Sequence, residues 1–259
     1  MSPSVISRVM SILNLFHERK PWITIEEIAT ALGVSAASAY RYASELTQGG
    51  LLSRTSGRYR LGPKIIELEY LIREYDPIIQ AAHGLMHGLA ELTGCSALLC
   101  NVYDGAVVNV AHIAGRRPLK LTYTKGLPMP LFRGSQAHIV LACMDRRKLK
   151  RLYEASVKDP ALAADVAAIG ADWRSFARKL KEIRALGYYI SRSELDEGVT
   201  GIAAPVFGEN QEIAGALVLS FDSAAPPTMS EETLVGLVVH GANEITRRIE
   251  QISGEQPQP

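Results

Sequence analysis

Apolar residues recur at intervals of three and four along the first fifty positions, which is the period of helices that bury one face. The first such set comprises Ile6, Val9, Met10, Leu13 and Phe16. Thr24 and Glu27 then form a capping box that begins a short helix, and Gly33 supplies the left-handed residue that ends it. A further helix begins after Ser35 and runs to the Gly49-Gly50 pair. Helix, glycine turn and helix in this order predict a helix-turn-helix.

The later of these two helices is expected to pack mostly through alanine and to present polar and aromatic side chains. Its inward positions are Ala36, Ala39, Ala43 and Leu46. On or beside the outer face we place Ser38, Tyr40, Arg41, Tyr42 and Glu45. Hydroxyl and guanidinium groups near the start of a helix suit contacts with base edges in the major groove of DNA. The pattern therefore indicates a recognition helix.

A basic hairpin is predicted directly after this helix, with two short strands on either side of Ser56-Gly57. It carries Arg54, Arg58 and Arg60, which are suited to the phosphate backbone. The alternative is an ordinary three-helix domain with solvated arginines, but the order and spacing of the elements favour a DNA-binding winged helix. The predicted DNA contacts are Ser35, Ser38, Tyr40, Arg41, Arg54, Arg58 and Tyr59.

A helix with a narrow apolar stripe is predicted between Gly62-Pro63 and Asp76-Pro77. The stripe comprises Ile65, Leu68, Ile72 and Tyr75. It suits packing against its own copy in a second subunit, or against the C-terminal part of the same chain. Both interpretations stay open.

The remaining chain alternates between strand and helix patterns. A helix from Ile78 to Gly94 precedes strands at 97–103, 106–113 and 119–124, with Asp104-Gly105 as a hairpin turn. Helices are then predicted at 135–143, 146–155 and 173–186, strands at 188–191, 202–207 and 213–221, and a last helix from Ser230. Strands, helices and strands again predict an α+β fold with an antiparallel sheet.

Charge is unevenly distributed along a chain whose net charge is only +1. Residues 1–62 hold seven Lys and Arg against four Glu, so the excess of positive charge lies in the predicted DNA-binding part. The three cysteines lack Cys-x-x-Cys spacing, and His83 and His87 lack a third partner, so no disulfide framework, metal or cofactor is expected. Without a secretion signal or a long apolar run, we expect a cytoplasmic protein with no membrane partner.

Two other classes of protein are less consistent with the residues. An enzyme with an appended DNA-binding domain is not favoured, because the sequence has no Gly-x-Ser-x-Gly elbow, phosphate loop or dinucleotide motif. An architectural DNA binder would leave about two thirds of the chain without a role. A non-enzymatic regulator that senses a small molecule is the remaining interpretation.

The sequence resembles the IclR family of bacterial transcriptional regulators over nearly its whole length. The resemblance is carried by Ser4-Val5 through Leu15-Phe16, Ile28-Ala29 with Leu32-Gly33, Ser38-Ala39-Tyr40-Arg41, Gly50-Leu51, Tyr59-Arg60-Leu61-Gly62, Leu92-Thr93-Gly94, Gly126, Pro130 through Leu141-Ala142, Ile183-Arg184, Gly187-Tyr188, Glu194, Gly198-Val199 and Ile202-Ala203-Ala204-Pro205-Val206. It implies a winged helix, a linker helix that helps dimerisation, and an effector domain resembling the GAF fold. It also implies homodimers, often paired into homotetramers, on palindromic double-stranded operators.

The expected boundaries follow from these patterns together. Residues 1–62 form the winged helix-turn-helix, 63–76 the linker helix and 77–253 the GAF-like effector-binding domain, and 254–259 form a disordered tail.

The resemblance also implies where an effector binds. Carried over position by position, the ligand-binding residues are Phe132, Arg133, Gly134, Ser135, Ser191, Gly201, Val218 and Ser220, and we add Tyr123 as an aromatic contact for the ligand. Members that bind very small oxo-acids have Asp, Cys and Ser where this chain has Ser191, Gly201 and Val218. We therefore expect a roomier, less polar pocket and an organic acid, specifically an aromatic carboxylate paired with Arg133. The alternative is that Arg133 lies on the surface and that other residues line the pocket.

Overall fold

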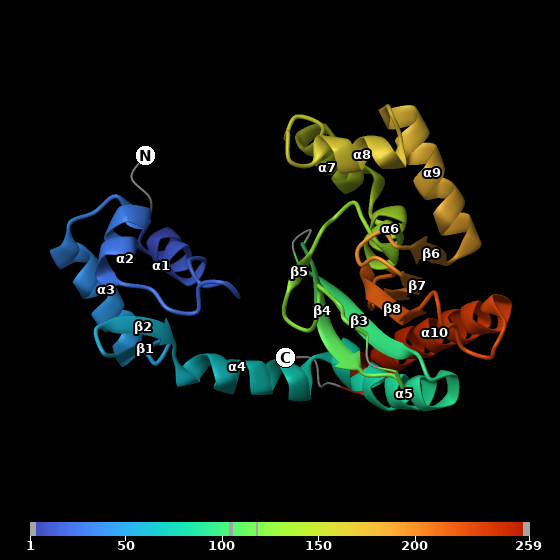
Figure 1. Cartoon of the computed structure of the whole chain (residues 1–259), viewed down its shortest axis with the longest axis horizontal. Coiled ribbons are helices and arrows are strands. Elements are labelled where there is room, and N and C mark those ends of the chain that lie inside the picture. The colour runs from blue at the N-terminus through green and yellow to red at the C-terminus, as the bar shows by residue number, and fades with distance from the viewer. Residues whose placement is uncertain (1–3, 104–105, 118, 256–259) are drawn as a thin grey trace. The chain divides into compact units, whose positions relative to one another are not determined.

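The computed structural model describes residues 4–103, 106–117 and 119–255, and the chain divides into two compact units, Met1–Tyr75 and Asp76–Pro259. Figure 1 shows the elements of each unit. Among the described residues, the helices are too short or too polar to cross a membrane.

The first unit contains four helices and one hairpin. Its elements are α1 (Val5–Leu13), α2 (Ile25–Leu32), α3 (Ala36–Gln48), β1 (Leu52–Thr55), β2 (Arg58–Leu61) and α4 (Pro63–Tyr75). The capping box forms as predicted, because Thr24 Oγ1 accepts from the Glu27 amide and Glu27 Oε2 accepts from the Thr24 amide at 2.8 Å. Gly33 adopts a φ of 62° and ends α2. These local signals define a helix-turn-helix with a two-stranded wing.

The structure of this unit corrects three predictions about exposure. Ala36, expected at an inward position, is exposed in the first turn of α3. Tyr42 is buried with Ala39, Ala43 and Leu46, because these positions share one helical face. The placement of Tyr42 on the outer face was therefore wrong. Tyr59 is only 3% exposed and its backbone pairs with that of Ile23, so its ring packs in the core instead of facing solvent.

The second unit is a six-stranded antiparallel sheet between helices. The strands are β3 (Ser96–Tyr103), β4 (Ala106–Ile113), β5 (Pro128–Met129), β6 (Tyr189–Arg192), β7 (Val199–Phe207) and β8 (Ile213–Asp222). Their order across the sheet is β5-β4-β3-β8-β7-β6, and every recorded pair is antiparallel. The chain is thus of the α+β class.

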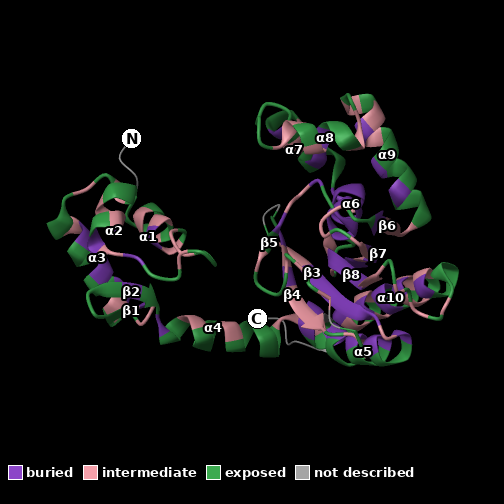
Figure 2. Cartoon of the chain, in the orientation of Figure 1, coloured by how far each residue is buried: buried purple, intermediate pink, exposed green. Residues whose placement is uncertain are grey.

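Helices cover both faces of this sheet (Figure 1). On one face lie α5 (Pro77–Thr93) and α10 (Glu231–Glu255), and on the other lies α6 (Ser135–Cys143), against which α9 (Trp173–Leu186) packs. Two further helices, α7 (Arg146–Ser156) and α8 (Ala163–Ile169), follow α6 in the chain. The central strands β3, β8 and β7 are largely buried, as the purple ribbons of Figure 2 show.

Alternation along the strands separates two cores. Leu99 and Leu217 belong to the core with α5 and α10, whereas Leu98 and Val218 belong to the core with α6 and α9. Since successive strand residues point to opposite faces, both faces of β3 and β8 need apolar residues. This arrangement explains their continuous apolar runs.

Several predicted boundaries differ from the structure. Residues 119–124 are not a strand: Leu121 and Tyr123 pack against the core beside α6, and the Tyr123 carbonyl accepts from Asn109 Nδ2. The short strand β5 pairs with β4 instead. Helix α8 was not predicted, and α10 includes residues 254–255, which were expected in the tail. The turn at 104–105 and residues 256–259 lie outside the described residues.

Candidate functional site

The start of α3 presents polar groups to solvent. Ser35 caps the helix, its hydroxyl accepting from the Ser38 amide at 3.3 Å, and Tyr40 and Arg41 are exposed one turn further on. An exposed arginine beside a helix start has the reach and charge to contact a base edge or a phosphate. The four residues predicted on this helix therefore share an accessible surface, although Ser38 is only partly exposed.

The wing is joined to this surface through an arginine. The Arg54 guanidinium lies 5.7 Å from the ring centre of Tyr40 on α3 and 5.9 Å from that of Tyr59 on β2. Arg54 and Arg58 are both exposed, whereas Tyr59 serves as the buried ring beneath Arg54. The predicted DNA contact by the Tyr59 side chain is therefore wrong, because its burial leaves no path to a nucleic acid.

Sequence reasoning missed Arg8 as a part of this surface. Arg8 Nη1 donates to the Tyr42 hydroxyl at 2.8 Å, and the guanidinium groups of Arg8 and Arg41 lie 5.9 and 5.6 Å from the Tyr42 ring centre. The Arg8 hydrogen bond and the two positive charges lower the pKa of Tyr42. No local signal points to a contact between residues 34 positions apart, which only the packing of α1 on α3 creates.

A cavity lies in the second unit where three strands line up small residues. Strand register places Gly201 of β7 directly between Ser191 of β6 and Ser220 of β8, so all three share the sheet face covered by α6. A Cβ added to Gly201 would lie 2.9 Å from Ser135 Oγ on α6, 3.2 Å from Ser191 Oγ and 3.7 Å from Ser220 Oγ. The missing side chain of Gly201 therefore creates a notch ringed by three hydroxyl groups. The cavity has a volume of about 40 Å³.

The hydroxyls around this notch are buried but poorly paired. Ser135 and Ser220 are 5% and 7% exposed, and no hydrogen bond recorded among the described residues uses either side chain. Ser191 Oγ reaches only the Gly201 carbonyl, at 3.5 Å. Buried polar groups are nearly always paired with protein, water or ligand. The three serine hydroxyls can therefore bind water or a ligand that enters the cavity.

Two carboxamides form another wall of the cavity. Gln136 Nε2 donates to Asn109 Oδ1 at 2.6 Å, and Asn109 Nδ2 donates to the Tyr123 carbonyl at 2.8 Å. The Gln136 carbonyl oxygen remains available as an acceptor.

An acidic loop between β6 and β7 closes the cavity. Glu194 accepts from the Gly134 amide and from the Tyr189 hydroxyl, each at 2.9 Å, and Asp196 Oδ1 accepts from the Thr122 amide at 3.1 Å. Burial and the neighbouring Glu194 carboxylate raise the pKa of Tyr189 strongly, so this hydroxyl stays a donor. These bonds hold the loop against α6 and against the segment that contains Tyr123.

The structure brings together six of the nine predicted ligand residues. Tyr123, Ser135, Ser191, Gly201, Val218 and Ser220 all line the cavity. Sequence reasoning missed the other residues that line it, which are Leu98, Asn109, Leu121, Met129, Gln136, Glu194, Leu195, Asp196 and Val199. The Glu194 match to the family pattern was the one available signal, and it was not used for the site.

Three predicted ligand residues do not line the cavity. Phe132 is 2% exposed and packs on Phe176, with ring centres 6.3 Å apart. Arg133 is exposed and donates through Nε and Nη2 to the Glu194 carbonyl at 3.1 and 2.6 Å. Gly134 has a φ of 85°, and a Cβ there would lie 2.5 Å from Leu195. The expectation that Arg133 lies inside the pocket is therefore wrong, and the alternative, in which Arg133 lies on the surface and other residues line the pocket, agrees with the structure.

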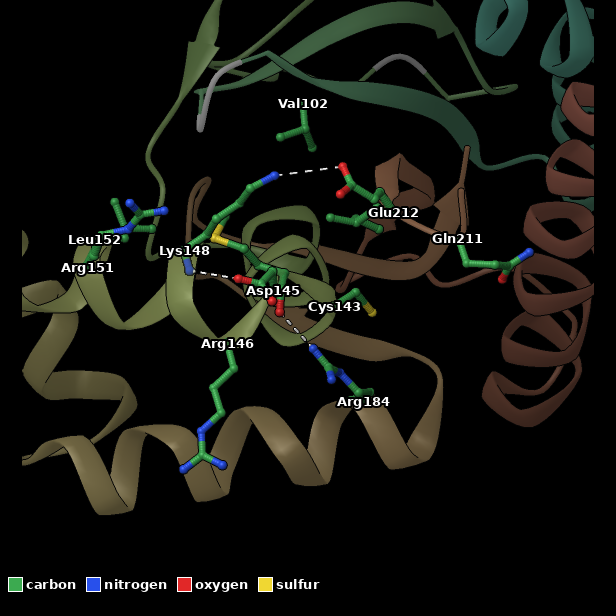
Figure 3. A pocket seen from close by; sticks show the side chains of 12 residues that line it. Val102, Cys143, Asp145, Arg146, Lys148, Arg151, Leu152, Arg184, Gln211 and Glu212 are labelled. Atoms are coloured by element: carbon green, nitrogen blue, oxygen red, sulfur yellow. Dashed lines mark hydrogen bonds and ion pairs between the residues drawn. The ribbon is translucent and has the colours of Figure 1, made fainter. Parts of the chain in front are cut away.

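A larger hollow beside α7 offers a poorer case for specific binding. Its volume is about 770 Å³, and Figure 3 shows its charged side chains arranged around an open space. Lys148 and Glu212 are 3.8 Å apart and mostly exposed, while Arg184 donates to the Met144 carbonyl at 2.9 Å. Because these groups are solvated or satisfied, size alone does not make this hollow the functional site.

Thiol and metal chemistry find little support in the described part of the chain. Burial raises the pKa of the Cys100 thiol to about 12, and it also raises those of Cys95 and Cys143, which keeps the thiols protonated. The rings of His83 and His87 are 4.9 Å apart, but no group of three potential metal ligands occurs among the described residues.

Comparison with protein families finds two matches that cover both units. Residues 5–56 match the IclR helix-turn-helix domain, and residues 72–247 match the bacterial transcriptional regulator IclR C-terminal domain. The HTH-type transcriptional regulator KipR of Bacillus subtilis is 26% identical over 250 residues, which cover 94% of this chain and 96% of KipR. The Pca regulon regulatory protein of Pseudomonas putida is 23% identical, over 83% of this chain and 73% of that protein.

Solved structures show the same fold. An IclR transcriptional regulator from Alicyclobacillus acidocaldarius is 22% identical with a TM-score of 0.75, over 96% of this chain and 98% of that one. An IclR homologue from Microbacterium hydrocarbonoxydans, complexed with 4-hydroxybenzoate, is 19% identical with a TM-score of 0.74. The match covers 96% of this chain and 100% of that one.

Proposed function

Because the chain belongs to the IclR family of bacterial transcriptional regulators, we propose that it binds a palindromic operator as a dimer or a dimer of dimers, under the control of a small organic molecule. The observation that carries this proposal is the combination, in one chain, of an exposed arginine surface on a recognition helix and a cavity ringed by three serine hydroxyls. The chain is a DNA-binding regulator and not an enzyme. Its action on the bacterial chromosome would place it in the cytoplasm.

DNA recognition is assigned to α3 and the wing. Each α3 enters a major groove, where Arg41 and Tyr40 reach base edges and Ser35 and Ser38 contact the backbone near the helix start. Arg54 and Arg58 of the wing contact phosphates, which adds affinity for all sequences and orients the helix. Arg8 supports Arg41 through the shared Tyr42 ring.

Dimer formation is assigned to the apolar side of α4. Every residue of α4 is described, and none of them is buried. Leu68, Ile72 and Tyr75 of the predicted stripe are 41%, 51% and 67% exposed. Exposed apolar stripes of this kind mark association surfaces. Packing two α4 helices together would set the spacing of the two recognition helices on a two-fold symmetric operator. Light scattering coupled to gel filtration separates monomer, dimer and tetramer.

The effector is assigned to the cavity around Gly201. An organic acid, including an aromatic carboxylate, is one candidate class, since a structural neighbour is complexed with 4-hydroxybenzoate. A benzene-sized ligand needs a cavity of roughly 150 Å³, so an aromatic acid would require the loop at Glu194 to move aside. Whichever ligand binds, it controls DNA binding only through its different affinities for DNA-competent and incompetent conformations.

Fluorescence anisotropy with the upstream region of the protein's own gene tests the proposal. A regulator binds this DNA more tightly than random DNA of equal length, and ligand changes that affinity. Equal binding to both DNAs would identify a non-specific architectural binder and contradict the proposal. The Arg41→Ala variant is the specificity control, because it should lose the preference while remaining folded.

A further inference from the structure

We propose that the effector is an uncharged small molecule with two or more hydroxyl or carbonyl groups and two to four carbon atoms, and not a carboxylate. This inference rests on the proposed function, because it names the ligand class of the same cavity. It replaces the acid expected from the sequence. Three independent features of the cavity carry it: charge, hydrogen-bonding groups and size.

The charge of the lining opposes an anion. Among the described residues that line the cavity, the charged side chains are the carboxylates of Glu194 and Asp196, and no lysine or arginine lines it. The Arg133 guanidinium is exposed and bound to the Glu194 carbonyl. A ligand carboxylate would face two like charges at half-buried positions, which disfavours its ionised form.

The start of α6 compensates for this repulsion only in part. A helix N-terminus carries partial positive charge and attracts anions. Here Glu194 Oε2 already accepts from the Gly134 amide at 2.9 Å, so the protein supplies its own anion to the helix. His138 adds little, because its Nδ1 lies 2.9 Å from the Gly134 carbonyl and 3.6 Å from Glu194. A ligand carboxylate at the helix start would therefore lie beside Glu194 and share the first-turn amides with it.

The hydrogen-bonding groups suit neutral hydroxyls. Ser135, Ser191 and Ser220 each provide one donor and acceptor lone pairs around the notch at Gly201. The Gln136 carbonyl and the carboxylates of the acidic loop accept further hydrogen bonds. A ligand hydroxyl can both donate and accept, so it can satisfy a mixed set of this kind, whereas a carboxylate only accepts.

Size limits the ligand as the structure stands. A volume of about 40 Å³ corresponds to roughly three water molecules, if one water needs 10–15 Å³ of such space. Leu98, Met129 and Val218 provide an apolar wall for a short carbon skeleton. Even a two- to four-carbon polyol or hydroxyamide therefore requires the acidic loop to move, but by less than 4-hydroxybenzoate, which has ten non-hydrogen atoms, would require.

Isothermal titration calorimetry with matched pairs tests the inference on the full-length protein. The pairs are glycerol and glycerate, 1,2-propanediol and lactate, and lactamide and lactate, with 4-hydroxybenzyl alcohol and 4-hydroxybenzoate as larger probes. Near pH 7, where the acids are ionised, we expect an uncharged member to bind at least about tenfold more tightly than its acid. Tighter binding by any acid than by its neutral partner would overturn the inference, as would no binding by any compound at about 10 mM.

A matched pair of glycine variants tests the location. Gly201→Ala places a methyl group among the three hydroxyls, whereas Gly236→Ala places the same group on α10, where a Cβ meets nothing within 4 Å. We expect Gly201→Ala to weaken binding of the preferred ligand at least about tenfold and Gly236→Ala to leave it unchanged. Circular dichroism and thermal melting verify the fold of both variants. Unchanged binding by folded Gly201→Ala would overturn the site.

Asp196→Asn tests the role of charge. Asn keeps an oxygen for the Thr122 amide but removes one negative charge. We expect the preference for the neutral member of each pair to fall several-fold, mostly because the acid binds more tightly. An unchanged ratio would overturn the electrostatic argument.

Operator binding, measured in parallel, separates this inference from the proposed function. Ligand-sensitive, specific DNA binding together with a preference for acids would refute the ligand class and leave the regulator intact. If the wild-type protein shows no preference for the operator over random DNA, the proposed function is refuted. Calorimetry still decides the ligand class in that case.

Discussion

The two units use arginine in opposite ways. In the first unit, Arg8, Arg41 and Arg54 lie over tyrosine rings at 5.6 to 5.9 Å. Stacking of this kind orients a guanidinium while leaving most of its N–H groups available to an outside partner. In the second unit, Arg133 and Arg184 donate hydrogen bonds to backbone carbonyls. Residue type alone therefore does not distinguish an anion-binding arginine from a structural one.

Arg41→Ala is expected to have the largest effect. It tests whether a stacked arginine of the first unit contacts DNA. Operator affinity should fall by about 1 to 3 kcal/mol, because a base contact is lost, while affinity for random DNA should fall less. Competition anisotropy measures both. Arg178→Ala, which removes an exposed arginine from α9, is the charge-matched control. Equal losses in both variants would show that only net charge matters.

Arg184→Ala should destabilise the second unit without changing intrinsic DNA affinity. Its guanidinium donates to the carbonyls of Ala142, in the last turn of α6, and Met144, which caps that helix. Leaving these carbonyls unpaired should lower the free energy of unfolding by about 1 to 2 kcal/mol, since the site is partly solvated. Urea unfolding followed by circular dichroism measures the change, and Arg178→Ala on the same helix again serves as the control.

Arg58→Ala should weaken binding to every DNA sequence alike. A phosphate contact carries no sequence information, so the slope of log affinity against log salt should fall by about 1 in magnitude. Titrations at several salt concentrations provide that slope for operator and random DNA. A loss confined to the operator would mean that Arg58 contacts a base instead.

Arg133→Gln is expected to have the smallest effect. The side chain is exposed and lies outside the cavity, so both stability and affinity for the preferred ligand should change by less than about 0.5 kcal/mol. Calorimetry on the variant measures the affinity. Loss of binding would show that Arg133 turns inward on ligand binding, as the acid hypothesis requires.

Local signals in the sequence predicted much of the first unit. Caps at Thr24 and Ser35, the stop at Gly33 and the turn at Ser56-Gly57 act over three or four residues, so they survive without tertiary information. The same helical period that placed Ala39 and Ala43 inside also places Tyr42 inside, and only its polar hydroxyl suggested otherwise. The partnership of Arg8 with Tyr42 depends on packing between two helices and had no local signal.

By itself, the sequence determined the winged helix, the order of most elements and the family to which the chain belongs. The composition of the cavity around Gly201 was decided by tertiary structure, because its floor joins Ser191, Gly201 and Ser220 through strand register and its roof is Ser135. Whether Arg133 enters the cavity depended on the acidic loop, whose Glu194 carbonyl holds that side chain outside. Register and loop packing are set by many weak contacts between distant segments, which no short pattern of residues encodes.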